Sequence, residues 1–420
     1  MPNNWKTYKL SEVTEYIGRG ISPKYTDNLN IRVVNQRCIR DNKIIYETCR
    51  YHEIEKKSIS DVKYLIKHDV LVNSTGVGTL GRVAQFKSDF KDITVDSHVS
   101  IVRPVEDYAD EFFGYAIIEK QALIESLGEG STGQTELSRT RLGEDVNICL
   151  PESKKEREEI ASILSAIDDK IENNLAINKT LEEIAMALYK HWFVDFGPFQ
   201  DGEFVDSELG RIPKGWEVKN LGSIVSVLGG YAFKSACFQD SGVKVLKIKN
   251  INNNIVDINN CTCISEEISK TINPKFRVTK GDFLIAMTGA EVGKVGAVPD
   301  YNQELWLNQR VGKLVDKELK NASILIGKLL QTNDFYKVMQ GLAYGSAQPN
   351  ISTSDIESIK IALPIDKSIL NEIIDEFVNY HEIIIQNLTE NQTLTQLRDT
   401  LLPKLISGEM RLKEFVSSDK

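Results

Sequence analysis

The segment Asn174-Leu-Ala-Ile-Asn-Lys-Thr-Leu181 recurs as Asn387-Leu-Thr-Glu-Asn-Gln-Thr-Leu394, with both asparagines and the Thr-Leu pair at the same places. The two copies lie 213 positions apart in a chain of 420 residues. In the stretches around both copies, apolar residues recur at steps of three and four, which is typical of helices that pair along a seam. The segment therefore predicts two related long helices.

Five further matches extend this similarity over the whole chain. They occur in the same order in both halves, and the offset between partners stays between 211 and 214 positions. A nearly constant offset is the signature of an internal repeat, so the chain consists of two copies of one unit. The partners are Trp5-x-x-x-x-Leu10 with Trp216-x-x-x-x-Leu221, Asp69-Val-Leu-Val-Asn-Ser-Thr-Gly76 with Asp282-Phe-Leu-Ile-Ala-Met-Thr-Gly289, Gly81-Arg82-Val83 with Gly293-Lys294-Val295, Gln134-x-x-x-Ser138 with Gln348-x-x-x-Ser352, and Leu150-Pro151 with Leu363-Pro364.

Each copy begins with a globular part of mixed character. Short alternating apolar runs, separated by Gly, Asn and Ser, indicate strands and loops. Residues 111–127 and 322–340 have helical patterns, so we expect an α+β fold for both globular parts. The expected strands include 31–34, 69–72 and 99–102.

A long helix follows each globular part. Ser153 and Glu156 fit a capping box at the start of the first helix. No Gly or Pro interrupts the two helical stretches before Gly197 and Pro403. A helix from about residue 154 to 192 would be on the order of 55–60 Å long. The seam positions are Ile160, Leu164, Ile167, Ile171, Asn174, Asn178, Leu181, Ala185 and Leu188 in the first helix, and Ile373, Phe377, Tyr380, Ile384, Asn387, Asn391, Leu394, Arg398 and Leu401 in the second.

The asparagines predict how the helices pair. In each helix two of them replace apolar residues at adjacent seam positions near the middle. A polar seam residue lowers stability but defines the register when it meets another polar residue. If the helices run antiparallel, Asn174 and Asn178 face Asn387 and Asn391. The alternative is that these positions face solvent.

The net charge of −9 argues against a DNA binder that relies on charge alone. The acidity is unevenly distributed, however. Residues 1–100 contain 16 Lys and Arg against 12 Asp and Glu, whereas residues 151–200 contain 6 against 10 and residues 364–408 contain 3 against 7. The excess of acid therefore lies in the predicted helices, and the globular parts remain free to meet phosphate.

Motifs of catalysis and metal binding are missing from the sequence. Gly289-Ala-Glu-Val-Gly293-Lys294 is one residue short of a phosphate-binding loop. Asn273-Pro-Lys-Phe276 only superficially resembles the Asn-Pro-Pro-[Tyr/Phe] loop of adenine methyltransferases. Cys261 and Cys263 have no nearby histidine to complete a zinc site. Six scattered cysteines, no apolar run of membrane-spanning length and no signal-peptide pattern favour a cytoplasmic protein.

Polar loops at equivalent places in the two copies are the candidates for contact with double-stranded DNA. Arg can bond bidentately to guanine and Asn or Gln to adenine, and glycine lets the backbone approach closely. Equivalent loops with different side chains predict one scaffold that carries two reading surfaces. The candidates are Arg37, Arg40, Ser74, Thr75, Gln134, Arg139 and Arg141 in the first copy, and Lys249, Asn252, Thr288, Gln348 and Asn350 in the second.

Three longer motifs make the chain resemble the specificity subunits of type I restriction–modification systems, over essentially its whole length. They are Glu208-Leu-Gly-Arg-Ile-Pro-Lys-Gly-Trp216, Leu188-Tyr-Lys-His-Trp-Phe-Val-Asp-Phe196 and Leu397-Arg-Asp-Thr-Leu-Leu-Pro-Lys-Leu-Ile-Ser-Gly-Glu409. The resemblance implies two target recognition domains related by a pseudo-twofold repeat, together with two spacer helices that form an antiparallel coiled coil. The expected parts are domain 1 (1–150), a central spacer helix (151–200), domain 2 (201–363), a C-terminal spacer helix (364–408) and a tail (409–420).

The resemblance also implies a role and partners. Such a subunit is non-catalytic, reads a bipartite DNA target, and directs two modification (methyltransferase) subunits and then restriction subunits to it. S-adenosylmethionine, ATP and magnesium are expected on those partners and not on this chain. The alternatives are a self-sufficient DNA methyltransferase or nuclease, and a coiled-coil scaffold with no role on DNA.

Overall fold

The computed structural model describes residues 2, 4–28, 30–130, 135–252, 254–343 and 349–412. The chain folds into two compact units. Unit 1 comprises Met1–Asp169 and Leu394–Lys420, and unit 2 comprises Lys170–Thr393. Helix α4 (Lys154–Tyr189) and helix α9 (Lys367–Ile406) each contribute one part to unit 1 and the other part to unit 2.

Unit 1 consists of strands around three short helices and the adjoining parts of α4 and α9. The strands are β1 (Trp5–Lys9), β2 (Thr14–Arg19), β3 (Tyr25–Thr26), β4 (Ile31–Val34), β5 (Ile39–Arg40), β6 (Lys43–Ile44), β7 (Arg50–His52), β8 (Val70–Asn73), β9 (Val83–Gln85), β10 (Ile93–Val95), β11 (Val99–Pro104) and β12 (Asn147–Pro151). The helices are α1 (Glu111–Glu119), α2 (Gln121–Ser126) and α3 (Arg139–Glu144).

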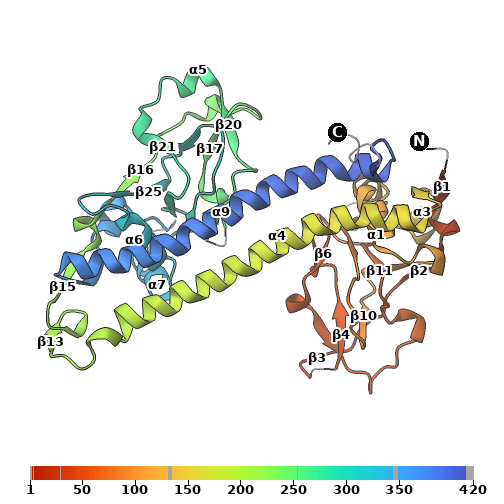
Figure 1. The fold of residues 1–420 in the computed structure, drawn as a ribbon, viewed down its shortest axis with the longest axis horizontal. Coiled ribbons are helices and arrows are strands. Elements are labelled where there is room, and N and C mark those ends of the chain that lie inside the picture. Colours follow the sequence, from red (N-terminus) through yellow and green to blue (C-terminus); the bar gives the residue numbers. More distant parts are fainter. Residues whose placement is uncertain are drawn as a thin grey trace, which may run out of the picture. The chain divides into compact units, whose positions relative to one another are not determined.

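The strands of unit 1 form two four-stranded sheets and two separate two-stranded pairs. One sheet has the order β2-β11-β8-β9 and is antiparallel throughout. The other has the order β10-β4-β7-β3, and in it β10 runs parallel to β4. The remaining pairs are β1 with β12 and β5 with β6. Figure 1 shows β2 and β11 of the first sheet and β3, β4 and β10 of the second.

Unit 2 has the same kinds of element. Its strands are β13 (Phe204–Ser207), β14 (Gly210–Pro213), β15 (Trp216–Asn220), β16 (Val225–Gly229), β17 (Val243–Leu246), β18 (Ile251–Asn252), β19 (Ile255–Val256), β20 (Thr262–Ile264), β21 (Arg277–Val278), β22 (Phe283–Ala286), β23 (Val295–Ala297), β24 (Leu305–Leu307), β25 (Val311–Asp316) and β26 (Lys360–Pro364). Its short helices are α5 (Glu266–Ser269), α6 (Ala322–Leu330), α7 (Asn333–Leu342) and α8 (Thr353–Glu357).

The strand order confirms the internal repeat. The series β16-β25-β22-β23 in unit 2 has the same pairing as β2-β11-β8-β9 in unit 1. The parallel pair β17–β24 corresponds to β4–β10, and β15–β26 corresponds to β1–β12. The α+β fold of both globular parts, predicted from alternating and helical patterns, is therefore confirmed.

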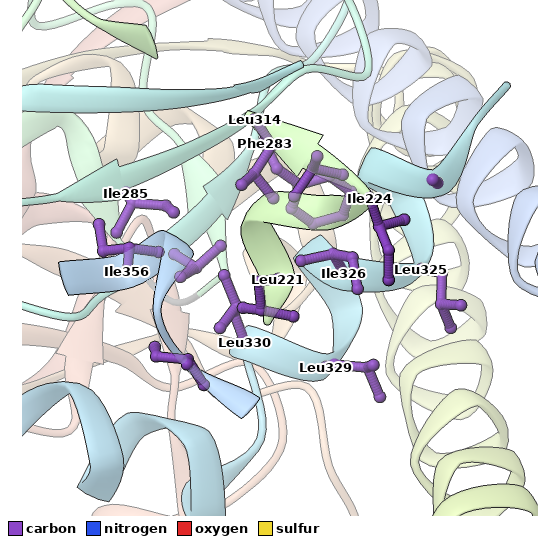
Figure 2. Packing of buried hydrophobic residues seen from close by; sticks show 14 of the residues in the cluster. Leu221, Ile224, Phe283, Ile285, Leu314, Leu325, Ile326, Leu329, Leu330 and Ile356 are labelled. Carbon is purple, nitrogen blue, oxygen red and sulfur yellow. The ribbon is translucent and has the colours of Figure 1, made fainter. Parts of the chain in front are cut away.

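The core of unit 2 lies between its large sheet and helix α6. Figure 2 shows Phe283 and Ile285 of β22 among side chains from α6 and from the turn that begins at Leu221. Ile326 and Leu329 of α6 are fully buried there. Burial of this many apolar side chains is the main term that stabilises such a domain.

Some details of the helices differ from the sequence-based expectation. Each of the helical stretches 111–127 and 322–340 forms two helices. The backbone leaves helical geometry at Lys120 in unit 1, and Thr332 caps a new helix in unit 2.

Of the capping box predicted at the start of α4, the structure shows one of the two hydrogen bonds. The backbone N–H of Glu156 donates to Ser153 Oγ over 3.3 Å. The Glu156 carboxylate, however, accepts hydrogen bonds from Asn4, Trp5 and Arg411.

Candidate nucleic-acid interface

The seam asparagines form two amide pairs within unit 2. Asn174 Nδ2 donates to Asn391 Oδ1 over 2.9 Å, and Asn387 Nδ2 donates to Asn178 Oδ1 over 2.8 Å. The order of these partners shows that α4 and α9 run antiparallel. Asn178 and Asn391 also donate to backbone carbonyls of the opposite helix, those of Ile384 and Ile171. The structure therefore confirms the prediction that Asn174 and Asn178 face Asn387 and Asn391.

In unit 1 the turn after β8 is the centre of the candidate reading surface. Gly76 and Gly78 have φ values of 104° and 71°, a region that favours glycine. Thr75 Oγ1 and His98 Nδ1 are 2.7 Å apart; Thr75 is half-buried and His98 is exposed. Ser74, in contrast, is fully buried and its hydroxyl lies 2.6 Å from that of Ser100. We therefore leave Ser74 out of the proposed DNA contacts.

The loop after β4 lies next to this turn. Thr79 Oγ1 donates to Gln36 Oε1 over 3.3 Å, and Asn73 Nδ2 donates to the Gln36 carbonyl over 2.9 Å. Arg37 and Arg40 are exposed and follow directly in the chain. The structure thus brings Arg37, Arg40 and Thr75 to connected loops of one unit.

Unit 2 repeats this arrangement with other side chains. Thr288 and Asn350 form a backbone bridge, and the N–H of Met287 donates to the Arg310 carbonyl over 3.1 Å. Lys249 and Asn252 are exposed around the hairpin β18–β19. The candidates of the second copy that the structure describes therefore lie on turns equivalent to those of the first.

The remaining candidates differ in their surroundings. Arg139 is exposed at the first position of α3 and lines a shallow pocket with Glu15 and Glu144. Arg141 contacts two carboxylates, at 2.6 Å from Glu129 and 3.0 Å from Asp145. Gln134 and Gln348 lie outside the described residues.

Sequence reasoning missed three cationic or polar residues on these surfaces. Arg82 lines a pocket with Arg37 and Arg40. His98 and Arg310 occupy matching positions beside the two glycine turns. The match of Gly81-Arg82-Val83 with Gly293-Lys294-Val295 was a signal for Arg82, because it places a cation at the same position of both copies. His98 and Arg310 carried no comparable signal, since no motif surrounds them.

Within the described ranges, no three His, Cys, Asp or Glu side chains gather in a way that could hold a metal ion. None of the described helices is both long and apolar enough to cross a membrane.

Comparisons with known proteins match nearly the whole chain. A family model described as the type I restriction modification DNA specificity domain matches residues 2–183 and again 213–396. The MjaIX specificity subunit of a type I restriction enzyme from Methanocaldococcus jannaschii is 28% identical, over 99% of this chain and 95% of its own length. The HindI specificity subunit from Haemophilus influenzae is 23% identical, over 97% of this chain and 100% of its own length.

A solved structure has a similar fold. The S subunit of a type I restriction–modification system from M. genitalium superimposes with a TM-score of 0.60 at 18% identity, and 97% of each chain is covered. The double match to the family model has the same period as the repeat described above. The chain therefore belongs to the type I restriction–modification DNA specificity family.

Proposed function

We propose that this chain reads a bipartite DNA target and directs partner methyltransferase and restriction subunits to it. The observation that supports this most directly is the repeated surface. Two copies of one scaffold present glycine turns and a hairpin at equivalent places, with His98 beside the glycine turn of one copy and Arg310 beside that of the other. Equivalent scaffolds with different polar side chains are suited to reading two different short sequences.

The chain would act without catalysis of its own. S-adenosylmethionine, ATP and magnesium would bind two modification subunits and the restriction subunits, in agreement with the lack of nucleotide-binding motifs in the sequence. The expected place of action is the cytoplasm, where the chain would meet double-stranded DNA.

Exchange of one recognition domain tests this function. Residues 1–150 are replaced by the corresponding part of a relative, and the chimera is produced with its modification subunits in a host that lacks other adenine methylation. We expect sequencing of methylated adenines to show one changed block of the target and one unchanged block. The matched control exchanges residues 201–363 and should change the other block. A change of both blocks, or of neither, in a chimera that still methylates DNA contradicts the proposal.

A further inference from the structure

We propose that a three-arginine pocket in unit 1 binds a phosphate group of the DNA backbone. The inference rests on the proposed function and adds to it one specific anchoring site. We call this site the arginine pocket. It has a volume of about 500 Å³ and is lined by Arg37, Arg40, Asp41, Asn42, Thr79, Arg82 and Gln121.

The backbone around the arginine pocket is held in place by hydrogen bonds. Asp41 and Asn42 have φ values of 50° and 60°, as in the tight two-residue turn that joins β5 to β6. Asn42 Nδ2 donates to Gln121 Oε1 over 2.9 Å and to the Val83 carbonyl over 3.1 Å. The hairpin that bears Arg40 is therefore fastened both to α2 and to β9.

Arg82 fastens the opposite wall. Its Nη2 donates to the Gly78 carbonyl over 2.9 Å and its Nη1 lies 3.4 Å from the Ile39 carbonyl. Two of its five N–H groups are thus used to join the turn after β8 to the hairpin. The other N–H groups remain available to a ligand, so Arg82 both shapes the pocket and contributes charge to it.

The charge balance of the pocket favours an anion. Three guanidinium groups line it against the single carboxylate of Asp41. Within the part of the chain that the structure describes, no ion pair joins Arg37, Arg40 or Arg82 to a carboxylate. Arginine forms paired, charge-assisted hydrogen bonds with phosphate oxygens. An occupant with several anionic oxygens would therefore satisfy donors that now face solvent.

The concave shape argues for a phosphate rather than for the edge of a base. Base edges lie at the floor of a groove and are read by elements that protrude from a protein. Phosphates project outward from the duplex, so they fit into a recess. Backbone contacts of this kind position a protein on DNA and add affinity without reading sequence.

Unit 2 carries less positive charge at the equivalent positions. The equivalent positions are Lys249, Asn252 and Lys294. Lys294 forms an ion pair with Glu291, and Asn252 is neutral. The unequal charge predicts that the phosphate anchor belongs chiefly to unit 1.

The test measures DNA affinity of the complex with its modification subunits at several salt concentrations. The variants are Arg37→Ala, Arg40→Ala and the double variant, since both side chains are exposed and should not affect folding. We expect the double variant to bind target and non-target duplexes more weakly by the same factor. The slope of log affinity against log salt should fall by about 1. The double Arg→Lys variant should keep most of that slope, because it keeps the charge.

A scan with uncharged methylphosphonate linkages identifies the phosphate. At one position of the duplex, replacing the phosphate by an uncharged linkage should weaken binding by the wild-type complex. The same replacement should not weaken binding by the double Ala variant any further. Lys91→Ala, which removes an exposed cation of the same unit outside the pocket, is the control and should remain sensitive at that position. A double variant that stays as sensitive as the wild type overturns the inference.

Two other outcomes would also overturn it. A changed methylated sequence in the double variant would mean that the arginines read bases. Stabilisation of the wild type but not of the variant by inorganic phosphate, with equal DNA affinity of both, would mean that the pocket serves a free phosphate compound. If the wild-type complex binds no DNA at all, the proposed function itself fails, which is a different result from binding that does not depend on the pocket.

Discussion

Asp168 of α4 and His381 of α9 occupy the same position of the repeat, 213 residues apart, but their surroundings differ in chemistry. In unit 1, Asp168 accepts hydrogen bonds from Tyr115 Oη at 2.7 Å and from Arg398 at 3.1 Å. In unit 2, His381 is 2% exposed and stacks on the ring of Phe283, with centroids 4.9 Å apart. One unit thus uses a paired charge where the other uses a neutral aromatic group.

A second pair of positions shows the same kind of difference. Asp69, just before β8, is bound by both Nε and Nη2 of Arg103 at 2.8 and 2.7 Å. Its counterpart Asp282, just before β22, pairs with Lys313 at 3.5 Å and accepts a hydrogen bond from the Thr279 N–H at 2.8 Å. Burial raises the pKa of both carboxyl groups, and the neighbouring cation opposes that rise in each. The repeat therefore preserves strands and helices while the polar contacts inside each unit have diverged.

The largest expected effect of this divergence is a loss of folding stability when the buried ion pair of unit 1 is broken. Arg103→Met should destabilise unit 1 by about 3–5 kcal/mol, because it leaves the fully buried Asp69 without its partner. Lys313→Met in unit 2 should have a smaller effect, since that pair is longer and more exposed. Urea unfolding followed by hydrogen exchange, resolved by unit, measures both losses. Equal losses in the two units would show that the different geometry has no energetic consequence.

The second expected effect is a pH dependence of the stability of unit 2. Burial, together with the charge of Lys328, lowers the pKa of His381 to about 4. The unfolded chain therefore takes up this proton first as the pH falls. The stabilising contribution is complete above about pH 6.5 and is lost towards pH 4, a change of about 3 kcal/mol. Glu182 interacts electrostatically with Lys328, so the titration of Glu182 has to be separated from that of His381.

His381→Gln provides that separation. Glutamine cannot titrate but still offers an N–H to the Gly281 carbonyl, which His381 Nε2 contacts at 3.1 Å. From pH 7 to pH 4 the wild type should lose stability relative to the variant, because only the wild type carries His381. Glu182 contributes equally to both proteins. A constant difference over this range would contradict the assigned role of His381.

The smallest expected effect on stability concerns the seam, where the two copies are most alike. Changing Asn174, Asn178, Asn387 and Asn391 together to Leu should preserve folding, because an all-apolar seam also packs well, but it should loosen the register. The measurement is the spacing between the two methylated blocks of the target. A single unchanged spacing in the variant would mean that the asparagines do not define the register.

Local patterns in the sequence determined much of this protein. The steps of three and four predicted α4 and α9, and the paired motifs predicted the repeat, since both depend only on residues close together in the chain. The facing of Asn174 with Asn391 was predictable as well, because a buried amide in an apolar seam requires a polar partner. Family membership followed from motifs that lie within single segments.

Only the tertiary structure decided which polar loop residues face outward and which meet. Ser74 and Thr75 are adjacent in sequence, yet one is buried against Ser100 and the other contacts His98. The arginine pocket forms because Arg82 reaches carbonyls on two separate loops. The contacts of Thr75 with His98 and of Arg82 with Ile39 join residues more than 20 positions apart, and the direction of each loop depends on the strands that hold its ends. No periodicity within a segment encodes that direction, so it emerges only when the strands pair and the core packs.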